Sequence, residues 1–111
     1  MAALLHEQHC VACKPGSPHL SREEIEERLR QLEGWTVDEV DGHLRLAKVF
    51  TFKGFMPGVE LVNRIARVAE AEKHHPDLLL SYGSVTVWLT THAADGITQN
   101  DFILAAKIDR I

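Results

Sequence analysis

Three segments of the chain carry apolar residues at every third or fourth position, which is the spacing of an amphipathic helix. These segments are residues 21–34, 54–73 and 98–111. Ser21 suits the N-cap of the first segment, with Glu24 as its capping-box partner, and Gly34 can end that helix. Thr98 and Asp101 form a similar box before the last segment. The pattern therefore predicts three helices.

Between the helical segments, apolar and polar residues alternate, which predicts strands covered on one face. Residues 35–52 fit two strands around a turn at Asp41-Gly42, and residues 77–92 fit two more around Gly83. The last strand would place one set of side chains inward, namely Val85, Val87, Leu89 and Thr91. The resulting order is helix, strand, strand, helix, strand, strand, helix, which is typical of an α+β domain.

Residues 1–20 show neither periodicity, and Pro15, Gly16 and Pro18 mark turns there. We expect an irregular N-terminal arm over this range. It contains a Cys-x-x-Cys pair, Cys10 and Cys13. A zinc site would need two further ligands, which the nearby histidines could supply: His6, His9 and His19. Half a ligand set is weak evidence, so a mobile, proline-rich loop is the preferred interpretation.

Composition narrows the function classes. The chain has 111 residues, 45% apolar and 25% charged, which suits one globular domain. Its net charge of −4 provides no basic surface for nucleic acid. It contains no apolar run of about 18 residues, so we expect no membrane span. The first residues also lack a signal-peptide pattern, which predicts a cytoplasmic protein with reduced cysteines.

Seven histidines are many for a chain of this length. His74 and His75 stand together before Pro76, where the second helix would end and a strand begin. His92 ends the hairpin that follows. An antiparallel hairpin brings the start of its first strand beside the end of its second. We therefore expect the three imidazoles to converge at one corner of the fold.

Two carboxylates can reach the same corner: Glu70, one helical turn before His74, and Asp101 at the start of the last helix. Glu70 lies about 20° around the helix axis from Val59, at the margin of the apolar arc, where it needs a partner or must reach solvent. The residues alone leave three interpretations open. The cluster could transfer protons, bind a metal, or consist of exposed residues at a sheet end.

The spacing of these residues resembles that of the pterin-4a-carbinolamine dehydratases. The matching positions are Glu70, His74-His75-Pro76, Tyr82, His92 and Asp101. Flanking segments agree at Gly34-Trp35, 50–55, 89–92 and 101–109. The resemblance covers residues 21–111, which we take as one dehydratase-like domain. A spaced set of this length is far more specific than any single dipeptide in it.

This resemblance implies both a fold and an activity. The family fold is α+β, with a four-stranded antiparallel sheet and helices packed on one face. Family members dehydrate 4a-hydroxytetrahydropterin to quinonoid dihydropterin and so recycle the cofactor of aromatic amino acid hydroxylases. They use no metal and no other cofactor. We therefore expect a hydro-lyase with a small-molecule pterin substrate.

The resemblance also implies roles for individual residues. The expected catalytic residues are His74, His75 and His92. The expected substrate-binding residues are Glu70, Trp35 and Asp101. His74 and His92 would be the acid–base pair, and His75 would shape the pterin site. Glu70 would orient a histidine or bind the polar edge of the pterin. Trp35 would form an aromatic wall, and Asp101 would hold one imidazole in its productive tautomer.

A second function class stays open at this point. Some animal members of the family also act as dimerisation cofactors for a homeodomain transcription factor, so the chain could be a non-catalytic binding module of the same fold. The intact histidine set favours catalysis. The resemblance further implies a homodimer or homotetramer, in keeping with free strand edges in a four-stranded sheet.

Overall fold

A computed structural model describes residues 4–111 of the chain. The elements in chain order are the 3₁₀ turn η1 (Leu5–Glu7), α1 (Arg22–Leu29), β1 (Thr36–Val40), β2 (His43–Thr51), α2 (Met56–Glu72), β3 (Asp77–Ser81), β4 (Ser84–Leu89), the 3₁₀ turn η2 (His92–Ala94) and α3 (Gln99–Ile108). The predicted order of helices and strands is confirmed, with two short 3₁₀ turns added. No helix in the described range has both the length and the apolar character needed to cross a membrane.

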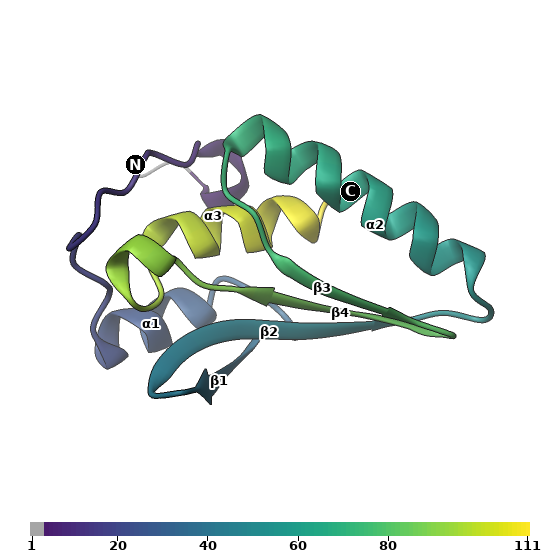
Figure 1. Cartoon of the computed structure of the whole chain (residues 1–111), viewed down its shortest axis with the longest axis horizontal. Helices are drawn as coiled ribbons and strands as arrows, with labels where there is room; N and C mark the ends of the chain where they lie inside the picture. Colours follow the sequence, from purple (N-terminus) through teal and green to yellow (C-terminus); the bar gives the residue numbers. More distant parts are fainter. Residues whose placement is uncertain (1–3) are drawn as a thin grey trace.

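The four strands form one antiparallel sheet in the order β1-β2-β4-β3, as expected. Figure 1 shows α2 and α3 on the same side of this sheet. The inward face of β4 is fully covered, with Val85, Val87 and Leu89 all at 0% exposure. These side chains share one buried cluster with residues of all three α-helices, among them Ile25, Ile65 and Phe102. The core therefore lies between the sheet and its helical layer.

Local signals that were legible in the sequence form as predicted. Ser21 and Glu24 make both hydrogen bonds of a capping box at the start of α1, and Thr98 and Asp101 do the same for α3. Asp41 and Gly42 join β1 to β2 with φ values of 53° and 82°. Two successive positive φ values are the signature of the tight hairpin turn that Asp-Gly favours.

The predicted end of the first helix is wrong, whereas the second helix ends within one residue of its predicted segment, 54–73, although Pro76 is not what ends it. Helix α1 stops at Leu29 rather than near Gly34, because the chain tightens so that the Leu32 N–H donates to Leu29 O. Helix α2 stops at Glu72, before Pro76 can act. Lys73 takes a left-handed conformation with φ 55°, and its N–H donates to carbonyls of the preceding turn. This αL residue turns the chain out of the helix.

The end of β4 also differs from its expected position. The strand stops at Leu89, and His92 begins η2 instead of ending the strand. A single bridge between Thr91 and Gly96 closes the loop around η2. His92 therefore stands on a tight turn rather than at an open strand end.

The N-terminal arm is irregular apart from η1, and it packs along the helical layer. Leu5 is 6% exposed and belongs to the core cluster. The Leu20 N–H donates to Ile97 O just before α1 begins. In Figure 1 the arm passes beside α3 and the end of α2 that leads into β3. Its position therefore differs from that of a free, mobile loop.

Candidate active site

His74, His75 and His92 meet at one corner of the fold, as the hairpin argument predicted. The β3–β4 register pairs Asp77 with Trp88, so the residues before β3 lie beside those after β4. All three histidines line one cavity of about 260 Å³. The β3–β4 pairing and the turn at Lys73 together direct the chain into this arrangement.

His74 is the most firmly held of the three imidazoles. Its Nε2 lies 2.6 Å from Oδ1 of Asp101, and its side chain is only 12% exposed. Asp101 is completely buried, and its Oδ2 accepts from the Thr98 N–H and the Thr91 hydroxyl. Because an ionised carboxylate has acceptors only, His74 Nε2 is the donor toward Oδ1. Nδ1 is then the ring nitrogen without a partner among residues 4–111.

His75 is held differently, near the surface. Its Nε2 lies 2.8 Å from Glu70 Oε1, and the two side chains are 62% and 82% exposed. Glu70 thus reaches solvent and pairs with a histidine, rather than lying against the buried side of α2. It does not line the histidine cavity. An exposed pair of this kind contributes little to stability, so its effect is chiefly to orient the ring.

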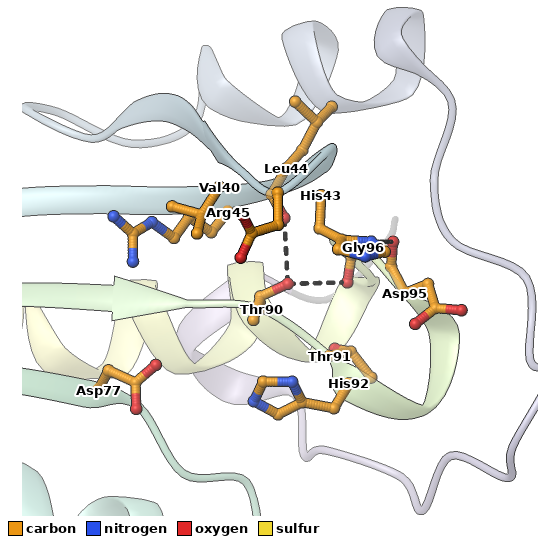
Figure 2. Close-up of a pocket in the computed structure, with 11 residues that line it drawn as sticks. Val40, His43, Leu44, Arg45, Asp77, Thr90, Thr91, His92, Asp95 and Gly96 are labelled. Carbon is orange, nitrogen blue, oxygen red and sulfur yellow. Dashed lines mark hydrogen bonds between the residues drawn. The ribbon is translucent and has the colours of Figure 1, made fainter.

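His92 lines a second cavity of about 320 Å³ as well as the first. Figure 2 shows its imidazole at the base of this second cavity, with Asp77 on one side and Asp95 on the other. Thr90 and Thr91 also line both cavities, and the Thr90 hydroxyl is bonded to the Leu44 and Gly96 carbonyls. Within the described chain His92 makes no side-chain hydrogen bond. Its ring is therefore free to contact a ligand from either cavity.

Both basic and acidic side chains line the second cavity. Arg45 stacks 4.6 Å from the centre of the Trp88 ring and donates to Asp38 at 2.6 Å. His43 Nδ1 lies 3.2 Å from the Asp95 carbonyl. Arg45 and His43 both line the cavity. This side of His92 can therefore receive a polar ligand or a polar substituent of one.

Trp35 is the expected site residue that the structure does not bring to this corner. It is 6% exposed, and its Nε1–H donates to Asp109 Oδ2 at 2.9 Å. Asp109 caps the end of α3, whereas Asp101 lies at its start, which separates them by about 12 Å along the helix axis. Trp35 lines neither cavity beside His92. In this position it packs in the core.

The N-terminal arm supplies a part of the cavity wall that was not predicted from the sequence. Val11, Ala12 and Cys13 line the cavity together with Asn100, which is 4% exposed. No periodic signal could have located these residues, because they are brought together by contacts across about 90 positions of the chain. The only hint was Asn100 itself, a polar side chain next to the capping residue Asp101.

Glu72 is the second residue that was missed. It is the nearly buried carboxylate of α2, at 10% exposure. Burial by itself would raise the pKa of Glu72, but the Cys10 N–H, His9 and Lys107 together hold that pKa below its ordinary value. Burial and the nearby Glu72 charge raise the pKa of the Cys10 thiol to about 12. Cys10 is therefore a protonated thiol at neutral pH and not a ready metal ligand.

The described residues contain no cluster of side chains arranged as a metal site. Among residues 4–111, no group of three or more histidine, cysteine, aspartate or glutamate side chains is placed to hold one ion. His74 and His75 turn their Nε2 atoms to separate carboxylates, Asp101 and Glu70. The geometry suits proton transfer at separate nitrogens, for which imidazole is well matched near neutral pH.

Comparisons with known proteins agree with this geometry. The family model for pterin 4 alpha carbinolamine dehydratase matches residues 18–111. A protein of Rubrobacter xylanophilus, provisionally named a pterin-4-alpha-carbinolamine dehydratase, is 44% identical over 107 residues, which are 96% of this chain and 97% of the relative.

Two solved structures share the fold. A transcriptional coactivator/pterin dehydratase from Brucella melitensis superposes with a TM-score of 0.74 at 35% identity, over 83% of this chain and 96% of its own. A pterin dehydratase-like protein, identified as a RuBisCO assembly factor in the alpha-carboxysome, superposes at 0.58 with 18% identity, over 70% and 88%. The second likeness is one of fold alone. On the family match and the 44% identity, the chain belongs to the pterin-4α-carbinolamine dehydratase family.

Proposed function

We propose that the chain dehydrates 4a-hydroxytetrahydropterin to quinonoid dihydropterin, with histidines as acid and base. The observation that carries this proposal is the cavity lined by His74, His75 and His92, in which buried Asp101 fixes His74. Family membership supports the same reaction. No metal or other cofactor enters the proposal.

The reaction needs two proton transfers and no change of oxidation state. The C4a–O bond breaks while a double bond forms between C4a and N5. One group gives a proton to the departing hydroxyl, which leaves as water, and another takes the proton from N5. Two imidazoles, one neutral and one protonated, can perform both steps, and each such transfer typically contributes about 10²–10⁴-fold.

We assign the acid–base pair to His74 and His92. Asp101 keeps a proton on His74 Nε2, so Nδ1 is the atom available for exchange with substrate. His92 has no competing protein partner in the described range and lies where the two cavities meet. His75, oriented by Glu70, would bind the polar edge of the pterin. The position of Trp35 offers no support for an aromatic wall, and that expected role stays a prediction.

A dehydration assay on His74→Ala, His92→Ala and the wild type tests this proposal. Each variant should lose about 10²–10⁴-fold in kcat, because each removes one proton-transfer group. His19→Ala is the matched control, since His19 lies outside the cavity on the arm and bonds only to the neighbouring Leu20 carbonyl. Wild-type rates in both site variants would contradict the catalytic assignment and favour a non-catalytic binding module.

Two further expectations accompany this function. We propose that the chain forms homo-oligomers, because β1 and β3 are free edges of the sheet and Leu79 on β3 is 52% exposed. Phe55 and Met56, at 44% and 61% exposure, add apolar surface where α2 begins. A cytoplasmic location, where pterin cofactors would be recycled, also stays a prediction.

A further inference from the structure

We propose that the N-terminal arm forms a wall of the pterin cavity that limits the size of the substrate's substituent, and that Asn100 clamps this wall in place. The wall consists of Val11, Ala12 and Cys13, all of which line the histidine cavity. The family model matches from residue 18 onward, so this wall comes from outside the matched region. The inference rests on the proposed function, because it takes a reduced pterin as the ligand.

Asn100 binds the arm through both ends of its amide. Its Oδ1 accepts from the Val11 N–H at 3.0 Å, and its Nδ2 donates to the Val11 carbonyl at 2.6 Å. This is the pairing that a neighbouring β-strand would offer to one residue. The same Nδ2 lies 3.5 Å from the Cys13 sulfur, and the Cys10 thiol donates to the Asn100 carbonyl at 3.6 Å. Asn100 thus holds the segment that borders the cavity, through its buried side chain and its carbonyl.

Further contacts hold the arm on both sides of this clamp. Before it, the Cys10 N–H donates to Glu72 Oε1 at 2.7 Å, and Lys107 Nζ donates to the His6 carbonyl at 2.9 Å. After it, the Gly16 N–H donates to the carbonyl of Ala93, which itself lines the cavity, at 3.0 Å. The wall is therefore held at both ends as well as at its centre.

The chemistry of the wall suits the exclusion of bulk rather than catalysis. Val11 and Ala12 carry no titratable group, and both are exposed, with Val11 at 72%. The cavity they border is about 260 Å³, just below the usual range for a ligand site, which begins at roughly 300 Å³. A fixed wall beside a cavity of this volume leaves room for a pterin ring with a compact substituent and disfavours the binding of a pterin with a long one.

Binding measurements on two reduced pterins test the wall directly. The probes are 6-methyl-7,8-dihydropterin, which is compact, and 7,8-dihydrofolate, which carries a long substituent. Wild type should bind the compact probe more tightly. Asn100→Ala should weaken its binding by about tenfold and bring the two dissociation constants closer together, because the loosened arm no longer bounds the cavity. Asn63→Ala, the same change at an exposed position on α2, should alter neither constant.

A second variant separates the wall from any direct contact between Asn100 and the ligand. Val11→Pro removes the N–H that Asn100 Oδ1 accepts and leaves Asn100 in place. It should reproduce the loss of discrimination, and it decides the question if Asn100→Ala does not fold. Wild-type discrimination in Val11→Pro would overturn the proposed wall, even if Asn100→Ala binds weakly.

Protection of Cys13 from alkylation supplies an independent readout. Cys13 lines the cavity, so a bound dihydropterin should slow its alkylation in the wild type, whereas Cys10 should react slowly with or without ligand. No protection at a saturating concentration would overturn the wall. If bound dihydropterin protects Cys13 from alkylation but the wild type shows no dehydratase activity, the proposed wall stands and the proposed reaction is wrong.

Discussion

Asp101 has two roles at the histidine site, one structural and one chemical. It closes the capping box of α3 through the Thr98 N–H, and it holds His74 through its other oxygen. A carboxylate suits both roles, but only the second requires it, because a group with acceptors only leaves the proton on His74 Nε2. The same buried group thus starts a helix and sets a tautomer.

Asp101→Asn should lower kcat by at least about tenfold while leaving the protein folded, and should cost about 1–3 kcal/mol of unfolding free energy. The amide can keep one acceptor for the Thr98 N–H, but its NH₂ would face His74 Nε2 and force that nitrogen to accept. Steady-state kinetics and urea unfolding measure the two effects. Asp109→Asn, the same change at the far end of α3, should cost stability through Trp35 and spare kcat. Equal kcat values in the two variants would contradict this role.

At the scale of elements, the turn between α2 and β3 decides where two of the histidines lie. Helix α2 ends because Lys73 adopts a left-handed conformation, and this turn sends His74 toward Asp101. Lysine is an unusual residue there, since a side chain at positive φ is strained and glycine is preferred. The site is therefore built next to a strained residue.

Lys73→Gly should raise the free energy of unfolding by about 1 kcal/mol, because glycine adopts this conformation without strain. Lys73→Ala is the matched control: it removes the same charge but keeps the side-chain strain, so it should not stabilise. Thermal and urea unfolding of the two variants give the comparison. A loss of stability in the glycine variant would show that the lysine side chain makes a favourable contact that outweighs the strain.

Elements of this chain differ in how far the sequence could predict them. The two capping boxes and the Asp-Gly turn depend on residues at most three positions apart, so they were legible and are confirmed. The residue that ends α2 could not be predicted. Pro76 is the stop signal that the sequence shows, whereas Lys73 adopts the left-handed conformation with no such signal in the sequence. Glu70 reaches solvent and pairs with His75, as expected for a carboxylate at the margin of the apolar arc. The burial of Glu72 was not predictable, because the angle around a helix says nothing of which neighbours cover it, and here the arm covers Glu72.

At the scale of the whole molecule, Glu72 attaches the N-terminal arm to the helical layer. Its carboxylate accepts from the Cys10 N–H and from His9 and lies 3.8 Å from Lys107 Nζ. The groups that face it are thus an amide, an imidazole and an ammonium, all of which favour its charged form. The pKa of Glu72 is accordingly lowered from 4.5. The histidine corner was foreseeable from the hairpin, whereas this long-range attachment was not.

A lowered pKa in the folded state means that Glu72 adds stability above its unfolded pKa of 4.5 and loses it as the pH falls through the folded value. Glu72→Gln should therefore destabilise the protein by about 1–2 kcal/mol at neutral pH. The difference from wild type should shrink as the pH falls below 4.5 and through the lowered pKa of the wild-type carboxylate, where this group takes up a proton. Urea unfolding at neutral pH and at a series of acidic pH values measures it. A difference that stays constant would show that the charge of Glu72 does not attach the arm.

The first turn of α3 carries a consequence for local motion. Asn100 and Asp101 are consecutive residues there, one bound to the arm and the other to His74. If this turn frays transiently, arm and imidazole are released in the same event, even while the sheet stays intact. Amide hydrogen exchange at Val11 and in this turn should then proceed at matching rates. The lifetime of one helical turn would set how long the site remains assembled.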